Sequence, residues 1–438
     1  MSEKNQNSWT ASAFSRQVCF QTDRLLDRGV ECGLMVIAAA ILVADLNHLL
    51  EYLFITLAIV VLTRQIASRN RRLARTSLDF PILLLLGWVL ISVFSATDFA
   101  YSFSEWRKLF AHILMFFLMV NFISEEVQVK RILGAFVVGM FLMSIYGIVE
   151  FFLANGSLVE QWHQRTLRAD ALTSEYHWFS TYLMMGLPIV MVWALSTNHR
   201  EWRFVLVVTL VVATFALFLT YTRGAWIAVA VQACVLVTLK GPNVMKIVLA
   251  GMLVFALGTL IVAIMQNEPK NASEKHGSME AEGDTMNLST LWCRIHIWEL
   301  GIKDVIERPI AGWGYGTKTF ARKYHDIHIS RCPPQLHNIH SSYGDFAFGA
   351  GIPALCFFLW LLLRILRTFW TGFLSGSSEF QRMLALGLLL MTVGMIIRIT
   401  FDVMFLGMLA VLFWMLAGLF FGLQRILNPA DLPSSRVM

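Results

Sequence analysis

The chain has 438 residues, of which 57% are hydrophobic and only 15% are charged. Soluble domains carry about 25% charged residues, so this composition excludes an ordinary soluble protein. The formal net charge is +6. In a chain this apolar, basic residues report loop orientation, so we expect no nucleic-acid partner.

Apolar stretches long enough to cross a bilayer recur along the whole chain. A transmembrane helix needs about 20 apolar residues, and these runs are continuous, whereas the strands of a membrane barrel alternate. The pattern predicts an all-α polytopic membrane protein with about twelve transmembrane helices. The expected spans are residues 30–46, 48–63, 79–96, 105–123, 132–153, 177–196, 203–221, 224–239, 246–265, 341–363, 383–400 and 403–424.

Loop charge predicts the orientation of these spans. Arginines crowd the connection after the second span, and basic residues recur in every second connection after it, which is typical of cytoplasmic loops. Both chain ends then lie in the cytoplasm. The polar N-terminus is expected to lead into a first apolar segment that anchors the chain in the membrane, and not to be a cleavable signal peptide. The expected regions are 1–28 (cytoplasmic segment), 29–265 (spans 1–9), 266–340 (a large, partly helical external loop), 341–425 (spans 10–12) and 426–438 (cytoplasmic tail).

The external loop concentrates the polar residues of the chain. It ends in His337-Asn338-Ile339-His340. It also holds Cys293 and Cys332, which would pair in an oxidising compartment; two unpaired cysteines are the alternative. No Cys-x-x-Cys sequence occurs, so a redox or zinc motif of that kind is not expected.

Arginines at the external membrane edge are candidates for an anion site. Arg223 joins two apolar spans with almost no loop, and a charge at that depth is costly without a partner. It is either a snorkelling interfacial residue or a phosphate ligand, because guanidinium suits bidentate phosphate recognition. Arg107 with Lys108 and Arg398 fall on the same side, which predicts a positive ring at one depth.

An amphipathic helix is expected from about residue 290 to 307. Arg294 and Trp298 are four residues apart and therefore share a face. Pro309, just after Arg308, ends the helix. Alternating glycines follow, at Gly312, Gly314 and Gly316. They permit close backbone approach, either in a plain turn or in a phosphate cradle.

The histidines offer a general base or a metal site. Imidazole titrates near neutral pH, so His340 could accept a proton, although an interfacial histidine is the simpler alternative. Gly351 follows eleven residues later and is expected below it on one helical face; Asp345 is a possible neighbour. His325 and His328 repeat the His-x-x-His spacing, so four histidines for zinc is a competing reading.

In this order, the residues resemble the O-antigen ligase and polymerase superfamily of bacterial membrane glycosyltransferases. The matching pattern is Thr222-Arg223-Gly224, Arg294 with Trp298, Arg308-Pro309 before the glycines, His340-Ser341, and Gly351. The resemblance covers roughly residues 205–360, and beyond them it rests on hydropathy. One departure is Ala354, where ligases usually have Gly, Thr or Tyr.

Within that superfamily, the ligase is the nearest match. The resemblance implies transfer of a polysaccharide from undecaprenyl pyrophosphate to a sugar hydroxyl of lipid A–core, at the periplasmic face of a Gram-negative inner membrane. No metal and no cofactor is expected. Alternatives are an O-antigen polymerase, a protein O-oligosaccharyltransferase and, more distantly, a transporter or flippase.

The resemblance also implies roles for individual residues. Arg223 and Arg294 would stabilise the pyrophosphate, and His340 would be the base of an inverting displacement. The remaining candidates would bind substrate: His337, Trp298, Arg308, Arg398, Arg107, Gly314 and Gly316. The expected partners are undecaprenyl-pyrophosphate-linked O antigen, lipid A–core and membrane lipids.

Overall fold

The computed structural model describes residues 25–67, 74–155, 168–173, 175–241, 288–324 and 338–427, and in these ranges all regular structure is helical. A helix over residues 25–40 comes first. The elements after it are η1 (Ala44–Leu46), α2 (Asn47–Ala67), α3 (Asp79–Val93), α4 (Phe99–Phe122), α5 (Glu126–Asn155), α7 (Tyr176–Ser196), α8 (Arg200–Leu219), α9 (Arg223–Lys240), α11 (Leu288–Glu307), α12 (Thr319–Lys323), α13 (Ser342–Ser375), α14 (Glu379–Phe401) and α15 (Gly407–Leu427).

The predicted spans coincide with helices wherever the structure describes them. Eight of the described helices are long and apolar enough to cross a membrane, and α3 is a shorter apolar helix. The predicted span 246–265 lies outside the described residues. The all-helical membrane fold is therefore confirmed, and the count of twelve spans stays a prediction.

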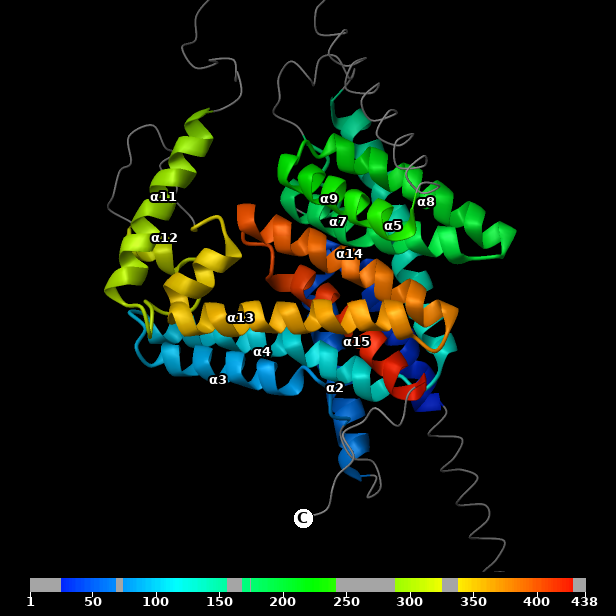
Figure 1. The fold of residues 1–438 in the computed structure, drawn as a ribbon, viewed down its shortest axis with the longest axis horizontal. Helices are drawn as coiled ribbons and strands as arrows, with labels where there is room; N and C mark the ends of the chain where they lie inside the picture. Colours follow the sequence, from blue (N-terminus) through cyan, green and yellow to red (C-terminus); the bar gives the residue numbers. More distant parts are fainter. Residues whose placement is uncertain are drawn as a thin grey trace, which may run out of the picture.

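Two buried helices, α14 and α15, form the centre of the bundle (Figure 1). α14 packs against α7, α9 and α13, and α15 packs against α4. Every residue from Leu409 to Leu423 of α15 is buried. By contrast, α2 and α8 present large exposed apolar side chains, as expected for helices that face lipid.

A buried glutamine joins three of these helices. Gln232 of α9 donates to the carbonyl oxygen of Met184 in α7 (3.2 Å) and to that of Leu390 in α14 (3.1 Å). The absence of a side chain at Gly394 leaves room for the Gln232 amide, because a Cβ at this position would overlap that amide. Polar side chains commonly link membrane helices in this way, since hydrocarbon offers no other partner.

A break in α13 fixes the position of the segment after α11. Gly351 interrupts the helix with φ 81°, so nearby backbone groups lose their helical partners. The chain from Pro309 to Gly314 supplies new ones: Ile352 N donates to Pro309 O (2.8 Å), Trp313 N to Phe348 O (2.9 Å) and Gly314 N to Gly349 O (2.9 Å). Broken membrane helices are tolerated where such partners exist.

The expected placement of Gly351 on one helical face below His340 is wrong. His340 has φ 53° and precedes α13, which begins at Ser342, so no continuous helix joins the two residues. The glycine is required instead by a close backbone approach. A Cβ at Gly351 would overlap the carbonyl oxygen of Ile310.

We predict that Gly351→Ala destabilises the protein. A non-glycine residue with left-handed backbone costs about 1–2 kcal/mol, and the overlap with Ile310 adds to that. Gly87→Ala is the matched control, because a Cβ at Gly87 in α3 meets nothing within 4 Å. Alanine should stabilise that helix by about 0.5–1 kcal/mol. The check is the thermal midpoint in detergent; equal midpoints for the two variants would contradict the expectation.

Candidate active site

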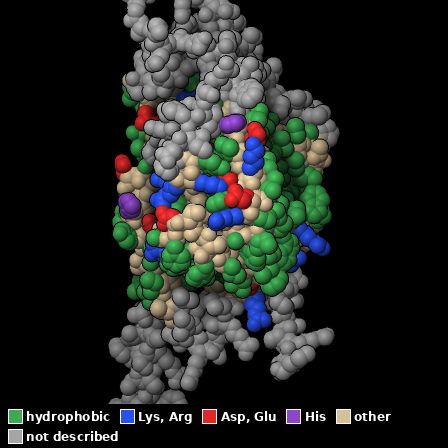
Figure 2. All heavy atoms as spheres, turned by 90° about the vertical axis from the view of Figure 1, so that its left-hand side faces the viewer, with side chains coloured by type: hydrophobic (Ala, Val, Ile, Leu, Met, Phe, Trp, Pro, Cys, Tyr) green, Lys and Arg blue, Asp and Glu red, His purple; other side chains and the backbone are tan. Residues whose placement is uncertain are grey.

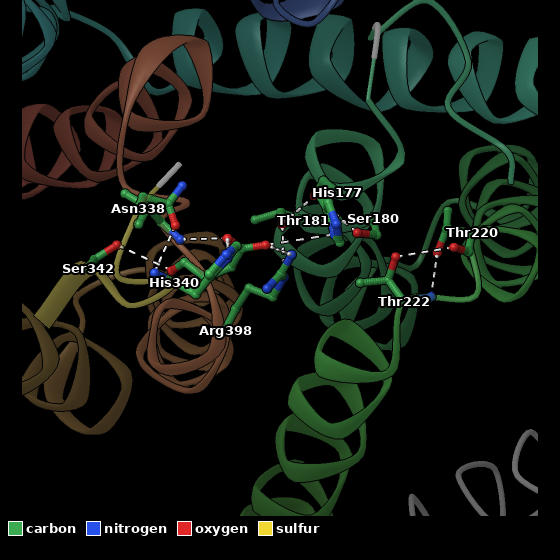
Figure 3. A network of polar contacts seen from close by, with 11 residues as sticks. His177, Ser180, Thr181, Thr220, Thr222, Asn338, His340, Ser342 and Arg398 are labelled. Atoms are coloured by element: carbon green, nitrogen blue, oxygen red, sulfur yellow. Dashed lines mark hydrogen bonds and ion pairs between the residues drawn. The ribbon is translucent and has the colours of Figure 1, made fainter. Parts of the chain in front are cut away.

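The buried carboxylate of Asp402 faces three side chains, those of His340, His177 and Arg398, which Figure 3 shows as sticks. Asp402 directly follows α14 and is 7% exposed. Its carboxylate lies 3.6 Å from His340 Nδ1, 3.8 Å from His177 Nδ1 and 3.5 Å from Arg398 Nη2. Val403 N also donates to it (2.9 Å). Three separate segments of the chain therefore meet at one negative charge.

Neighbouring backbone contacts hold His340 in place. His340 N donates to Asn338 Oδ1 (2.8 Å), and Trp298 Nε1 of α11 donates to Ile339 O (2.9 Å). Ser341 caps the first turn of α13 by accepting from Gly344 N. Trp298, predicted as a substrate-binding residue, thus anchors the backbone beside His340 in this structure.

Arg398, predicted at the external membrane edge, is buried inside the bundle, and its depth in the membrane stays a prediction. It is 2% exposed. Its Nε donates to Thr181 Oγ1 (3.1 Å), and its Nη2 faces Asp402. Since a buried guanidinium needs a counter-charge, Asp402 makes its burial tolerable.

The two arginines expected to bind pyrophosphate approach this group from different elements. Arg223 is exposed at the start of α9, and a Cβ on the adjacent Gly224 would lie 3.6 Å from Arg398 Nη1. Arg294 of α11 is close enough for its charge to act on His177 and Arg398. Among the described residues, neither Arg223 nor Arg294 forms an ion pair with a carboxylate, so both remain available to an anion.

Arg107 and Arg308 lie elsewhere. Arg107 contacts Ser104 and the ring of Phe103 on its own helix. Arg308 stacks on Trp313 at 4.0 Å from its ring centroid. The indole of Trp313 donates to Asp304 O (3.1 Å), which ties it to α11. The described contacts do not bring Arg107 or Arg308 to the Asp402 group, and the ring of positive charge at one depth stays a prediction.

Close packing accounts for the predicted glycine positions 314 and 316. Both have positive φ, 115° and 145°. A Cβ on Gly314 would come within 2.6 Å of Ser102 Oγ, and one on Gly316 within 2.6 Å of Tyr101 Cε1. The turn therefore packs on the start of α4, and substrate binding by these glycines stays a prediction.

Several candidates lie outside the described residues: His325, His328, Cys332 and His337. The four-histidine zinc reading is thus untested; among the described residues no cluster of three or more metal-ligating side chains occurs. Cys293 is buried and disulfide-bonded. Of the two alternatives for this cysteine the paired one is confirmed, and Cys332 as its partner stays a prediction.

Sequence reasoning missed Asp402 and His177. Asp402 is four residues after Arg398, the spacing of an ion pair on a helix, but it falls between two expected spans, and only Arg398 was considered. His177 seemed to be only the first residue of a span. Asp345, expected near His340, is replaced by Asp402 as the carboxylate that faces the imidazole.

The electrostatics keep Asp402 ionised. Burial by itself would raise the pKa of this carboxyl, but the facing His340 and the charges of Arg398 and His177 outweigh burial and hold the pKa well below its usual range. The carboxylate faces His340 Nδ1 at 3.6 Å without a hydrogen bond, and it favours the imidazole form that carries its proton on that atom. Nε2 is then left to act on a substrate.

A family model described as O-Antigen ligase matches residues 208–359, from α8 into α13. The match includes Arg223, Arg294 and His340, and it ends before Arg398 and Asp402. No curated protein sequence matches the chain.

We predict that Asp402→Asn lowers the thermal midpoint at neutral pH, because it leaves Arg398 buried without a counter-charge, a loss of about 3–5 kcal/mol. The pKa of Asp402 is lower in the folded state than its unfolded value of about 3.9. Its stabilisation is therefore present above about pH 4 and is lost as the pH falls through the folded pKa. The deficit of the variant should shrink below about pH 4.

The matched control is Glu299→Gln, which removes an exposed carboxylate paired with Lys303 on α11. Its thermal midpoint should follow that of the wild type at every pH. A constant deficit for Asp402→Asn across the acid range would contradict the assigned role of the carboxylate.

Proposed function

We propose that this chain, which matches an O-antigen ligase family model over residues 208–359, transfers a polysaccharide from undecaprenyl pyrophosphate to a sugar hydroxyl of lipid A–core. The observation that carries this proposal is the Asp402–His340 contact next to Arg294 and Arg223. It combines an oriented base with guanidinium groups that have no carboxylate partner among the described residues. A glycosyl transfer with a pyrophosphate leaving group needs both.

The arginines serve the donor. As the glycosidic bond breaks, negative charge grows on the pyrophosphate oxygen. Arg294 and Arg223 supply positive charge from fixed helices, and such preorganised groups stabilise a transition state without reorganising. Arg398 is engaged by Asp402 and Thr181, so its role is to hold Asp402 and to extend the positive field.

His340 serves the acceptor. Its Nδ1 faces Asp402, and Nε2 takes the proton of the attacking hydroxyl. The acceptor oxygen bonds to the anomeric carbon of the donor as the bond from that carbon to the pyrophosphate oxygen breaks. The electron pair leaves with undecaprenyl pyrophosphate, and a single displacement inverts the anomeric centre. Asp402 stabilises the imidazolium that results.

Two observations support a periplasmic site in a Gram-negative inner membrane, with both termini cytoplasmic. Cys293, one residue before Arg294, is disulfide-bonded, and disulfides persist in oxidising compartments. Lys, Arg, Asp and Glu side chains gather on the face of the molecule at this end, with hydrophobic side chains at its sides (Figure 2). That distribution fits a membrane protein whose polar end meets water.

O-antigen polymerase is the second candidate. It is favoured by Ala354, which departs from the ligase pattern and is fully buried in α13. The two enzymes share a donor and differ in the acceptor, which is lipid A–core for the ligase and a second lipid-linked glycan for the polymerase. Transfer assays with each acceptor therefore distinguish them.

We predict that His340→Ala and Arg294→Ala each abolish capping of lipid A–core with O antigen while the protein stays folded. Loss of a general base costs about 10²–10⁴-fold in rate, and loss of one charge-stabilising donor about 10²–10³-fold. The measurement is transfer with purified lipid A–core and undecaprenyl-linked glycan. Lys303→Ala is the control for Arg294, because Lys303 is an exposed cation on the same helix. Ladder lipopolysaccharide at wild-type level in a knockout that carries either variant would refute the assignment.

We also predict that transfer survives chelation. With a histidine base and arginine charge stabilisation, EDTA should leave the rate unchanged. Loss of activity that zinc restores would favour the four-histidine metal site instead.

A further inference from the structure

A cavity of about 390 Å³ lies next to the Asp402 group, between α4, the first turns of α13 and the chain after Trp313. Its volume is within the range of about 300–1,000 Å³ found for small-molecule sites. Aromatic and charged side chains line it together, among them Tyr101, Glu105, Lys108, Tyr315, Asp345 and Phe405.

The cavity is joined to the candidate active site by two residues of its lining. Ser342 Oγ donates to Asp402 O (3.5 Å), and Val403 N donates to Asp402 Oδ1 (2.9 Å). A ligand in the cavity would therefore lie next to the residues that flank His340 and Asp402 in the chain.

Asp345 is the feature of this cavity that calls for a ligand. It is 8% exposed, and among the described residues its carboxylate has no hydrogen bond and no ion pair. Its charged neighbours, Asp402 and Glu105, are both acidic. Buried carboxyl groups normally have a partner. One that lines a cavity without a partner is placed to form hydrogen bonds with a bound molecule.

Two of the three Lys and Arg side chains that line the cavity are paired with carboxylates, and the third, Lys318, is exposed. Lys108 pairs with Glu105 at 2.7 Å. Arg322 pairs with Asp98 and lies 4.0 Å above the ring of Tyr101. A pyrophosphate here would face the unpaired carboxylate of Asp345, whereas the charge of Arg294 acts on the opposite set, His177 and Arg398. An anionic ligand and a hydroxyl-bearing ligand are thus directed to different places around Asp402.

We propose that this cavity binds the acceptor saccharide, with Asp345 accepting hydrogen bonds from its hydroxyl groups. Tyr101 and Tyr315 offer apolar ring faces to the sugar. The Tyr101 ring is fixed because its hydroxyl accepts from Lys318 N (2.9 Å). This assignment rests on the proposed glycosyl transfer. The assignment adds the position of the acceptor and the residue that selects a hydroxyl-rich ligand. Asp345 binds the acceptor, and His340 takes the proton of its attacking hydroxyl.

The test uses the full-length protein in detergent with Asp345→Ala and Asp345→Asn. Both should raise the KM for lipid A–core about 10-fold or more, because a hydrogen bond to a charged group is lost. The KM for the undecaprenyl-linked donor should stay within about twofold, a difference small against the about 10-fold expected for the acceptor. Calorimetric binding of delipidated core oligosaccharide should weaken by the same factor as the acceptor KM.

Two further variants separate binding from structure. Ser104 of α4 lines the cavity, so the larger side chain of Ser104→Phe fills part of it and should also raise the acceptor KM. Glu299→Gln, an exposed carboxylate on α11, should leave both KM values unchanged. The thermal midpoints of the Asp345 variants should equal or exceed that of the wild type, since they remove a buried carboxyl group that has no partner among the described residues. A residue with a merely structural role would lower the midpoint and leave the KM ratio unchanged.

An unchanged acceptor KM in both Asp345 variants, or an equal rise in the donor KM, would overturn the assignment. If the wild type neither binds the core oligosaccharide nor transfers glycan to lipid A–core, the ligase proposal fails, and the cavity is then tested with other saccharides. Asp345-dependent binding of any of them supports a saccharide site. Absence of saccharide binding by the wild type overturns it.

Discussion

The carboxylate of Asp402 is the charge on which the outer end of the bundle depends. Arg398 is almost fully buried and needs a counter-charge, and His340 and His177 turn their Nδ1 atoms to the same group. Burial makes these contacts strong, because little water screens them. The same contacts keep the carboxyl ionised. One charge thereby compensates a buried arginine and orients the proposed base.

Backbone geometry brings the other parts to this charge. The break in α13 at Gly351 releases backbone groups, and the chain from Pro309 to Gly314 satisfies them. This docking fixes the end of α11 against α13 (Figure 1). Trp298 of α11 then bonds to the backbone beside His340. Arg294, one turn earlier on the same face, is placed near Arg398 by the same helix.

Basic and acidic side chains lie on different sides of Asp402, which matches the needs of the two proposed substrates. Arg294 and Arg223 lie toward α9 and α14, while Asp345 and Glu105 line the cavity toward α4 and α13. A leaving pyrophosphate and an attacking hydroxyl need opposite surroundings, positive for the first and hydrogen-bond-accepting for the second. The proposed base lies at the boundary between the two.

Periodicity and hydropathy determined what is local. They identified the helices and the amphipathic α11 with Arg294 and Trp298 on one face, because such signals depend only on residues close in the chain. The roles of Arg223 and His340 rest on the family resemblance and stay predictions. Periodicity and hydropathy could not reveal that Asp402, 62 residues later in the chain, faces His340, or that Asp345 does not face it. The buried position of Arg398 and the close approach of Gly351 to Ile310 were equally hidden. Those facts depend on how separate helices pack, since the cost of burying a charge or a backbone group is decided by partners that only the tertiary structure supplies.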